Sequence, residues 1–598
     1  MKIADIKNKI TEMHAGDTKQ LEVVFSDDKR IIVEAPAGYG KTTTMVSRIA
    51  YLYVTGHIPN PKKMLGLTFS VNAALKVKRD VASKLPMLIG DDNNPISICQ
   101  RINVTNYHGF CKGILKKHGR LLSPFLSTDS NLFLAVGDTD DSIKQYLSNT
   151  ENKSLKGISE KIIQAKEVSI EEIDSYLSIV EQKLLPQRII THNSIILFTL
   201  KLFRTHPTIQ DFYRKYYPLI VVDEFQDTNR IAWDLLKCVI GNDTHLVFLG
   251  DSLQRIYGFI GALPNIMDIA KTQFEMKEIK LSQNYRFRNN PNMLRLDKNI
   301  RQIAQSYFNG TFQNSELAQI PFFYGITHED ECQFIINKII SLKYNYPDQK
   351  ITVLFKQRGP DVSILQEYLA NNDIDYFYGM FKDDDIEYVR FHNKCAEKLI
   401  QAFGIKKNIT NKALEKYANS IKNIYSSDNT SITKSLIILL DALVNKIKTD
   451  YSDLLPDERY DLLQDIFENK QLKQSMEYVN AQVILSTVHG AKGLEWDHVI
   501  IADIEPWIFP SFSVCGDCEN RFNKGATCSV PNLYNDTFRQ KYIDELSAFY
   551  VAVTRAKKQV YFSASTTRYN NNREQKQSKS SCFISLPGIN ASQNQIID

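Results

Sequence analysis

The stretch IIVEAPAGYGKTTT, from Ile31 to Thr44, joins an apolar run to a glycine-bearing turn and then to the start of a helix. This order predicts a buried strand followed by a loop whose backbone amides cradle phosphate groups. Gly38 and Gly40 let the backbone close around phosphate oxygens, and Lys41 can reach the β and γ oxygens of a nucleotide. The strict pattern GxxxxGK[ST] is missed at its first position, where Ala35 stands. The candidate phosphate-binding residues are Ala37, Gly38, Gly40, Lys41, Thr42 and Thr43.

A second stretch, VVDEFQDT from Val221 to Thr228, ends an apolar strand in two adjacent carboxylates. Such a strand end is the expected position of a Mg²⁺ ligand beside a phosphate-binding loop. We expect Asp223 and the Thr42 hydroxyl to bind Mg²⁺, and Glu224 to orient or deprotonate the attacking water. For the two carboxylates taken alone, a solvated pair at a turn is the commoner explanation. The two stretches together predict hydrolysis of ATP.

Composition sets only broad limits on this chain. Its 598 residues are enough for about four domains. An apolar content of 43% with 24% charged residues is ordinary for a soluble protein, and a net charge of +5 neither requires nor excludes a nucleic-acid partner. The first residues contain no apolar signal-peptide core, and no apolar run approaches the length of a membrane span. We therefore expect a cytoplasmic protein whose nine cysteines are reduced.

Short apolar runs predict two groups of buried parallel strands, which indicates an α/β fold. Each group is interrupted by a segment with helical periodicity. The Asn-, Gln- and Ser-rich segment from Tyr569 to Ser581 predicts a mobile connector. The expected strands are Ile31–Val33, Met64–Phe69, Leu219–Val222 and Leu246–Leu249 in the first group, and Pro321–Gly325, Ile351–Lys356, Asp375–Gly379, Val483–Leu485, His498–Ile501 and Val560–Ser563 in the second.

Segments from Gln20 to Ala556 resemble, in the same order, the signature motifs of superfamily 1 DNA helicases of the UvrD/Rep (PcrA-like) family. Besides the two stretches above, they are DTKQLEVV (Asp17–Val24), GLTFSVNAA (Gly66–Ala74), NYHGF (Asn106–Phe110), GDSLQRIYGFIGA (Gly250–Ala262), LSQNYRF (Leu281–Phe287), STVHGAKGLEWDHVI (Ser486–Ile500) and ELSAFYVAVTRAKK (Glu545–Lys558).

The resemblance implies two RecA-like P-loop NTPase core domains, each a parallel sheet flanked by helices, with two mainly helical insertions. The segment CFISLP (Cys582–Pro587) resembles the one that closes the second core domain, and because little follows it we expect no C-terminal nuclease domain. The expected parts are core domain 1 at residues 1–115 and 205–285, helical insertion 1 at 116–204, core domain 2 at 286–390 and 480–598, and a reduced helical insertion 2 at 391–479.

The resemblance assigns further residues to the ATP site. Gln20 would read adenine, Tyr285 would stack on it, and Glu495 would meet the ribose. Gln254 would sense the γ-phosphate, and Gln226 would couple the site to its neighbours.

Arg286 and Arg555 would neutralise the charge that builds during phosphoryl transfer. The resemblance puts them on the second sheet and Lys41, Asp223 and Glu224 on the first, so ATP would close the cleft. A surface ion pair is the alternative for either arginine.

Aromatic rings in these motifs are candidates for stacking on DNA bases, which tolerates any sequence and therefore suits a motor. Core packing is the alternative for each of them. Two further residues, Arg568 and Tyr569, fall where relatives carry a strand-separating hairpin, and an exposed loop is the alternative there. The remaining DNA-contact candidates are Phe69, Tyr107, Tyr257 and Phe259 for stacking, and His108 and His489 for bonds to phosphate oxygens.

Cys515, Cys518 and Cys528 form the pattern C-x₂-C-x₉-C. A structural zinc ion takes four ligands, and no fourth one is close in the sequence. Cys582 or His498 could supply it only if the fold brings one of them near. Reduced loop cysteines are the alternative.

The resemblance implies an ATP-dependent DNA helicase or translocase that moves 3′ to 5′ on single-stranded DNA and unwinds duplex in repair, recombination or phage defence. Its partners would be single-stranded DNA, junctions of single and double strands, and a nuclease or another repair or defence subunit. The compact second insertion, and Ile260 in place of an arginine, favour one alternative. This is a DNA-stimulated regulatory or protein-displacing ATPase of a multisubunit complex that unwinds little. An inactive adaptor is disfavoured because the ATP-site lysine, carboxylates and arginines are all present.

Overall fold

The protein is described by a computed structural model over residues 3–89, 100–126, 133–256, 258, 261–306, 316–382, 385–428, 430–452, 454–523, 525–533, 535–570 and 572–593. The chain forms two compact units, each drawn from three parts of the sequence. Unit 1 comprises Met1–Asn284, Phe391–Tyr417 and Asp453–Gln471, and unit 2 comprises Tyr285–Arg390, Ala418–Ser452 and Leu472–Asp598.

Unit 1 contains a six-stranded sheet in which all neighbours are parallel, in the order β3-β2-β6-β7-β1-β8. Strand β7 lies between β1, which leads into the glycine-bearing loop, and β6, which ends at the paired carboxylates. Because the strands are parallel, the segments that follow them meet at one edge of the sheet. The strands are β1 (Arg30–Glu34), β2 (Met64–Thr68), β3 (Ile102–Asn106), β6 (Leu219–Val222), β7 (His245–Gly250) and β8 (Lys277–Lys280).

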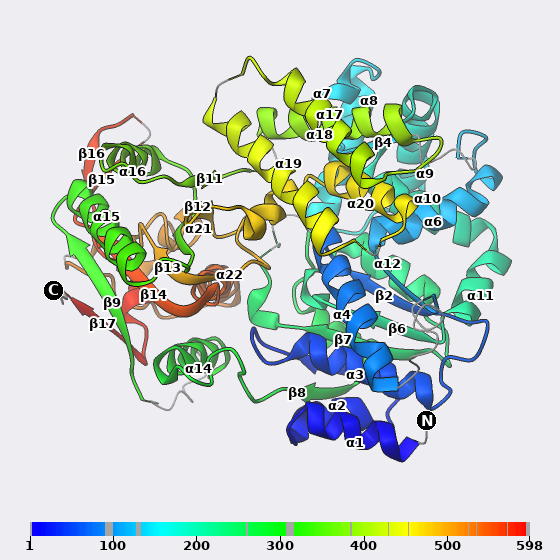
Figure 1. The fold of residues 1–598 in the computed structure, drawn as a ribbon, viewed down its shortest axis with the longest axis horizontal. Helices are drawn as coiled ribbons and strands as arrows, with labels where there is room; N and C mark the ends of the chain where they lie inside the picture. The colour runs from blue at the N-terminus through cyan, green and yellow to red at the C-terminus, as the bar shows by residue number, and fades with distance from the viewer. Residues whose placement is uncertain are drawn as a thin grey trace. The chain divides into compact units, whose positions relative to one another are not determined.

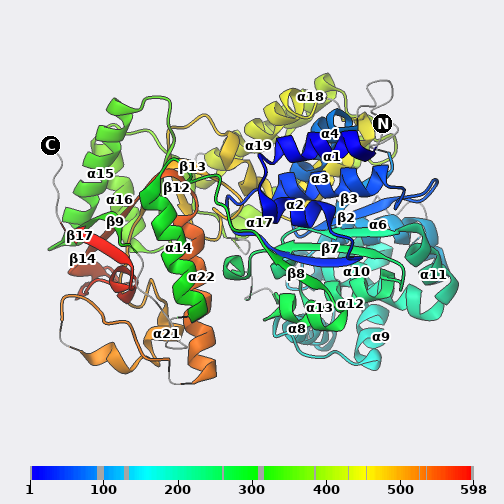
Figure 2. The same ribbon diagram turned by 90° about the horizontal axis from the view of Figure 1, so that it is seen from below.

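Helices cover both faces of this sheet because alternate strand residues point to opposite sides. Ile31 and Val33 pack in one hydrophobic cluster, and Ile32 packs in another on the opposite face. Figure 2 shows α1 to α4 on one side of the strands and α10, α12 and α13 on the other. These helices are α1 (Ile3–Met13), α2 (Thr18–Phe25), α3 (Lys41–Val54), α4 (Val71–Ile89), α10 (His192–Thr205), α12 (Arg230–Val239) and α13 (Ile266–Gln273).

The segment expected as the first insertion is mainly helical. It also holds a two-stranded parallel sheet, in which β4 (Leu134–Val136) pairs with β5 (Ile189–Thr191). Its helix α10 packs on α6 and α12 of the core. The insertion also holds α7 (Asp141–Lys144), α8 (Asn149–Ile163), α9 (Ile170–Ile179) and a π-helical turn at Val180–Leu184, and the core helices on either side of it are α6 (Tyr107–His118) and α11 (Pro207–Tyr216).

Unit 2 contains a seven-stranded parallel sheet in the order β11-β12-β10-β13-β14-β9-β17. Helices α15 (His328–Asn345) and α16 (Pro360–Asn371) form a hydrophobic cluster with β10, β12 and β13. Helices α14 (Pro291–Ser306) and α22 (Asp536–Val553) pack on each other and on β14. The strands are β9 (Ala318–Gly325), β10 (Ile351–Phe355), β11 (Phe377–Gly379), β12 (Val483–Thr487), β13 (Trp496–Ile501), β14 (Ala556–Ser565) and β17 (Ile589–Gln593).

Four long helices lie between β11 and β12 in the sequence (Figure 1). They are shared between the units: residues 391–417 and 453–471 group with unit 1, and residues 418–452 group with unit 2. Within unit 1, α20 contacts α4 and β4. The helices are α17 (Ile386–Phe403), α18 (Asn411–Ile424), α19 (Ser431–Thr449) and α20 (Pro456–Glu468).

The α/β class and the two parallel sheets expected from the sequence are confirmed, and each expected apolar run coincides with or overlaps a strand. The expectation of a mobile connector from Tyr569 to Ser581 was wrong at two places. Strand β15 (Thr567–Tyr569) pairs antiparallel with β16 (Gln575–Gln577). The three side chains of β16 are exposed, so backbone hydrogen bonds rather than side-chain burial order this strand.

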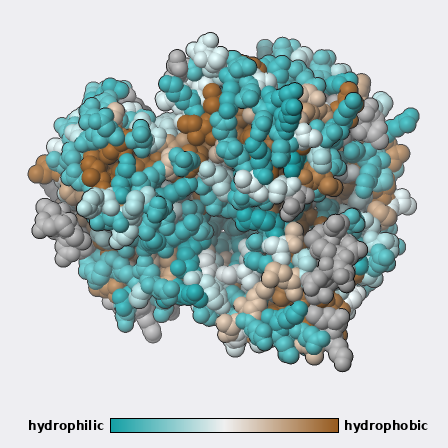
Figure 3. Space-filling view, viewed as in Figure 1, coloured by the Kyte–Doolittle hydropathy of each residue, from teal (hydrophilic) through white to brown (hydrophobic). Residues whose placement is uncertain are grey.

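Among the described residues, no helix is long and apolar enough to cross a membrane. On the face that Figure 3 shows, hydrophilic side chains predominate and hydrophobic areas are scattered.

Candidate functional site

The loop between β1 and α3 has the backbone shape that its glycines predicted. Gly38 and Gly40 have φ values of 83° and 77°, which residues with a side chain rarely adopt. Gly40 also precedes the first residue of α3, so the amino end of this helix lies at the loop. The loop is anchored at two points. The Ala35 N–H donates to Gly250 O at 2.7 Å, and the Asn284 side chain donates to Ala37 O at 3.4 Å.

Lys41 lies between the two carboxylates that follow β6. Its Nζ is 3.1 Å from Asp223 Oδ1 and forms a second ion pair with Glu224 Oε1. Burial opposes the charge on this ammonium, but the two carboxylates outweigh it and hold the pKa of Lys41 above its usual value. The side chains of Thr42 and Thr43 are half-buried beside Lys41. The hydroxyl of Thr42 and the carboxylate of Asp223 are the hard oxygen ligands that Mg²⁺ prefers.

A chain of hydrogen bonds extends from Glu224 to the end of β7. The Gln226 amide donates to Glu224 Oε2 at 2.6 Å, and its oxygen accepts the Asp251 N–H at 3.0 Å. Gln254 in turn donates to Asp251 Oδ2 at 2.7 Å. Glu224 itself has φ 51°, a conformation that is uncommon outside glycine. The chain therefore connects the candidate water-orienting carboxylate to the candidate γ-phosphate sensor.

Gln20 is held beside the same loop. Its amide nitrogen donates to Tyr39 O at 3.0 Å, and its oxygen bonds to His14 Nδ1. The other ring nitrogen of His14 lies 2.8 Å from the Ser47 hydroxyl. Burial lowers the pKa of His14, so this ring is neutral at physiological pH. His14 was not foreseen, because a single histidine in the turn after α1 carries no sequence signal.

The remaining ATP-site candidates lie in unit 2. Arg286 donates to Thr554 O at 2.6 Å and forms an ion pair with Glu495. Arg555 is only 3% exposed, and it donates to Val551 O at 2.9 Å and to Leu494 O at 3.1 Å. Unit 2 therefore brings Arg286, Arg555 and Glu495 together, and Tyr285 is half-buried next to Arg286 in the sequence.

The DNA-contact candidates of unit 1 differ in exposure. Phe69 is half-buried directly after β2, at the sheet edge where the Asp223 N–H bonds to Leu67 O. Tyr107 is 4% exposed, lies in the hydrophobic core and has its hydroxyl 3.4 Å from the Thr228 hydroxyl. A buried ring has no free face for a base, so the stacking expectation for Tyr107 is corrected to core packing. Tyr257 and Phe259 lie outside the described residues.

The two candidate histidines are neutral near pH 7. Burial lowers the pKa of His108 to about 4, with help from Lys112. Burial likewise lowers the pKa of His489 to about 4, with help from Lys356 and Lys473. Each ring could donate one hydrogen bond to a phosphate oxygen but would add no positive charge.

Arg568 and Tyr569 lie on β15 of the hairpin that β15 and β16 form. The Tyr569 hydroxyl donates to Glu329 Oε1 at 2.5 Å, and the Tyr569 N–H donates to Asp361 Oδ1 at 3.2 Å. Arg568 Nε is 4.0 Å from Glu505 Oε2. The hairpin therefore has a rigid base that rests on acidic side chains.

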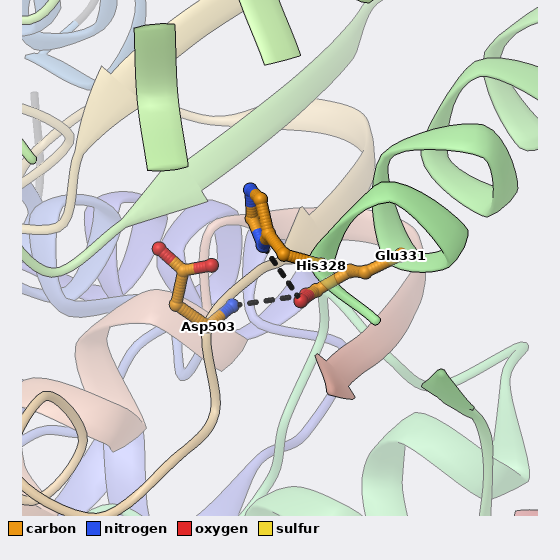
Figure 4. A group of neighbouring side chains, drawn as sticks. All are labelled: His328, Glu331 and Asp503. Carbon is orange, nitrogen blue, oxygen red and sulfur yellow. Dashed lines mark hydrogen bonds and ion pairs between the residues drawn. The ribbon is translucent and has the colours of Figure 1, made fainter. Parts of the chain in front are cut away.

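Close to Asp361 lies a buried group that the sequence did not reveal, since His328 Nε2 is 3.8 Å from Asp361 Oδ1. His328, Glu331 and Asp503 converge from the start of α15 and the end of β13, with ligand atoms within 4.8 Å of one another (Figure 4). His328 Nδ1 is 3.6 Å from Glu331 Oε2, and the Asp503 N–H donates to Glu331 Oε1 at 3.2 Å. Burial opposes a charge on His328, but Cys332 and the carboxylates outweigh it and raise the pKa of His328. We interpret the group as an imidazolium that balances buried carboxylates.

The geometry of unit 1 defines a P-loop ATPase: a lysine at the amino end of a helix, paired with carboxylates at a parallel-strand end. Residues 17–275 match the UvrD/REP helicase N-terminal domain family, and residues 381–567 match the UvrD-like helicase C-terminal domain family. The chain therefore belongs to the UvrD/Rep family of DNA helicases, whose members use ATP and Mg²⁺ and bind single-stranded DNA.

Two relatives illustrate the likeness along nearly the whole chain. The ATP-dependent DNA helicase PcrA of Staphylococcus aureus (strain MRSA252) is 23% identical over 669 residues, which cover 96% of this chain and 86% of the relative. The probable DNA helicase II homolog of Mycoplasma capricolum subsp. capricolum is 24% identical over 646 residues, which cover 91% and 83%. At this level of identity, single positions can differ from the family motifs, as Ile260 does in the place of an arginine.

Proposed function

We propose that this chain hydrolyses ATP to move 3′ to 5′ along single-stranded DNA and that it unwinds duplex DNA with a 3′ tail. The observation that carries the proposal is the group formed by Lys41, Asp223 and Glu224 after β1 and β6. It supplies the charges that phosphoryl transfer requires, on the scaffold that positions them in a P-loop ATPase. The polarity rests on family membership.

Each residue of the group has a distinct task in this proposal. Lys41, which stays protonated, binds phosphate oxygens. Thr42 and Asp223 would hold Mg²⁺, which neutralises phosphate charge when it is bound. Glu224 orients the attacking water, and Gln226 fixes the position of the Glu224 carboxylate. Arg286 and Arg555 of unit 2 stabilise the charge that develops on the γ-phosphate.

The decisive experiment measures ATP turnover with and without single-stranded DNA, together with unwinding of duplexes that carry a 3′ or a 5′ tail. We expect DNA to stimulate turnover, and only the 3′-tailed duplex to be unwound. Glu224→Gln should lower kcat by about 10² or more, because the carboxylate is lost while its shape is kept. Glu160→Gln, an exposed change on α8, is the matched control. Turnover that ignores DNA, or a fully active Glu224→Gln variant, would sink the proposal.

A second candidate function is a DNA-stimulated ATPase that displaces proteins within a larger complex and unwinds little. It is favoured by Ile260, which replaces the arginine of the YGFRGA motif and removes one cation from a segment that the resemblance places against DNA. A nuclease or a repair or defence subunit would be the partner. Stimulated turnover without unwinding of either tailed duplex would select this function over the first.

A further inference from the structure

Four cysteines of unit 2 surround one pocket. Cys515, Cys518 and Cys528 come from the long loop before α22, and Cys582 comes from the segment after the hairpin, 54 residues beyond Cys528 in the printed numbering. Each of the four thiols interacts electrostatically with the other three. The fold thus supplies the fourth donor that the sequence pattern lacked. His498, the other candidate, bonds instead to Gln349 at 2.8 Å and packs against Tyr346.

The backbone around the pocket is built to hold these two segments together. The Cys528 N–H donates to Ser580 O, and the Ser580 N–H donates to Ala526 O, both at 2.9 Å. The Lys579 ammonium donates to Asn523 O at 2.9 Å. Over the described residues of this loop, regular structure is limited to one helical turn at Phe512–Cys515 and one at Glu519–Phe522. A loop of this length with few helices or strands needs a local anchor.

The surroundings of the sulfurs favour thiolates that bind a cation. The backbone N–H of Trp507 donates to Cys515 Sγ, with 3.3 Å between nitrogen and sulfur. Hydrogen bonds to cysteine sulfur tune metal-bound thiolates. Arg521 and Lys579 also line the pocket and offset negative charge.

The spread of the sulfurs distinguishes between two kinds of centre. Four thiolates on one tetrahedral zinc ion, at about 2.3 Å each, lie about 3.8 Å from one another. Among the described residues, His328, Glu331 and Asp503 are the one group of three ligand atoms within 4.8 Å, so no three of these thiols are that close. In an iron–sulfur cluster each thiolate of a [4Fe–4S] core binds a different iron, which spreads the sulfurs around a larger centre.

We propose that Cys515, Cys518, Cys528 and Cys582 bind an iron–sulfur cluster that joins the loop before α22 to the segment after the hairpin. A preassembled cluster would be transferred to this site: the four S–H protons leave to solvent, and four Fe–S(Cys) bonds replace the bonds to the ligands that carried the cluster. The centre is structural in this proposal, because its ligands are separate from the ATP-site residues of either unit. A test of the cluster is therefore independent of a test of the helicase activity.

The test uses the full chain, isolated without oxygen, and measures iron, acid-labile sulfide and zinc per chain together with the visible absorption of a cluster. We expect iron and sulfide in near-equal amounts. Cys518→Ser and Cys582→Ser should each lose most of both. Cys518 is half-buried, so its replacement spares the core if the buried Cys582→Ser variant fails to fold. Cys238→Ser, a half-buried cysteine of unit 1, is the matched control and should keep the full content.

Three outcomes would count against the proposal. Zinc without sulfide, lost with Cys518, would keep the four-cysteine site but overturn the cluster. Iron or zinc that survives both cysteine changes and is lost with His328→Asn would place the metal at the histidine–carboxylate group instead. No metal above the level of Cys518→Ser would overturn the centre altogether. DNA-stimulated ATP turnover, measured in parallel, separates each of these results from a failure of the proposed function.

Discussion

The Gln226 amide donates a hydrogen bond of 2.6 Å to Glu224 and in this way ties the candidate catalytic carboxylate to the neighbouring strand end. Its oxygen accepts the N–H of Asp251, a fully buried residue. Sequence resemblance gave Gln226 only a general coupling role. The structure shows that one amide group satisfies partners after two different strands, β6 and β7.

We predict that Gln226→Ala lowers kcat for ATP by about 10- to 100-fold with little change in KM. The change leaves the Asp251 N–H without this acceptor, at about 1–3 kcal/mol, and releases Glu224 from a fixed orientation. Steady-state ATPase kinetics with single-stranded DNA would measure it. Gln182→Ala, an exposed glutamine, is the control. A kcat within about twofold of the parent, on the same measurement, would contradict the coupling role.

Arg555→Lys should nearly abolish turnover and spare most of the fold. A lysine keeps the charge but cannot reproduce the guanidinium bonds to Val551 O and Leu494 O together. Loss of a transition-state arginine costs about 10³- to 10⁵-fold in rate. Arg301→Lys serves as a control, because Arg301 is another buried arginine of unit 2 that donates to a side-chain hydroxyl, that of Tyr550. A near-normal kcat of the Arg555→Lys variant would contradict a role in the transition state and would indicate that Arg555 only packs within unit 2.

Tyr107→Phe should be nearly neutral, whereas Tyr107→Ala should destabilise unit 1 by about 3–5 kcal/mol. The ring is buried in the core, and its hydroxyl makes only a 3.4 Å contact with Thr228. Chemical denaturation followed by fluorescence, alongside binding of single-stranded DNA by Tyr107→Phe, would check both expectations. If Tyr107→Ala kept its stability but lost DNA affinity, base stacking would be restored as the role of this ring.

Tyr569→Ala should slow duplex unwinding and leave DNA-stimulated ATP turnover nearly unchanged. A ring that separates strands acts only at a junction, and stacking on a base is worth about 1–3 kcal/mol. A fluorescence unwinding assay on a 3′-tailed duplex would report the change. Tyr569→Phe removes the bond to Glu329 and keeps the ring, so it separates hairpin anchoring from stacking. Equal losses of unwinding in both variants would point to anchoring.

Acid should destabilise unit 1 through His108, which packs against His192. Burial lowers the pKa of His108 to about 4, so the unfolded chain binds more protons than the folded one between pH 6.5 and about 4. Stability therefore falls as the pH drops through that window, by about 1–2 kcal/mol for this partly exposed ring. His108→Gln should flatten the decline of Tm between pH 7 and 5. His206→Gln, a half-buried histidine between α10 and α11, is the control. An unchanged pH slope in His108→Gln would contradict this assignment.

Several strands that sequence reasoning found, β2, β6, β10 and β12, have every residue buried, and continuous apolar runs reveal such strands. It missed β8 and β17 for the opposite reason. The four residues of β8, Lys277 to Lys280, leave only Ile279 buried, as expected at an edge of a sheet. Strand β17, at the other sheet's edge, reads INASQ and holds its place by backbone pairing with β9. Edge strands that gain little from burial have no hydrophobic pattern to detect.

The candidate ATP site was largely predictable, because its residues lie in short motifs at strand ends. Groups assembled from distant parts of the chain were not. His328 and Asp503 are 175 residues apart in the numbering, and Cys582 completes the cysteine pocket only through the fold. Spacing along the chain cannot reveal such groups without knowledge of which strands are neighbours.

The two compact units exchange chain segments at five points, after residues 284, 390, 417, 452 and 471. No single cut can release either unit as a continuous polypeptide. A truncated fragment would therefore always lack part of a core, and a protease nick in one connection would leave four others intact. Two of these five crossings lie inside helices, after residue 390 in α17 and after residue 417 in α18, so a single continuous helix contributes to both units at each of these points.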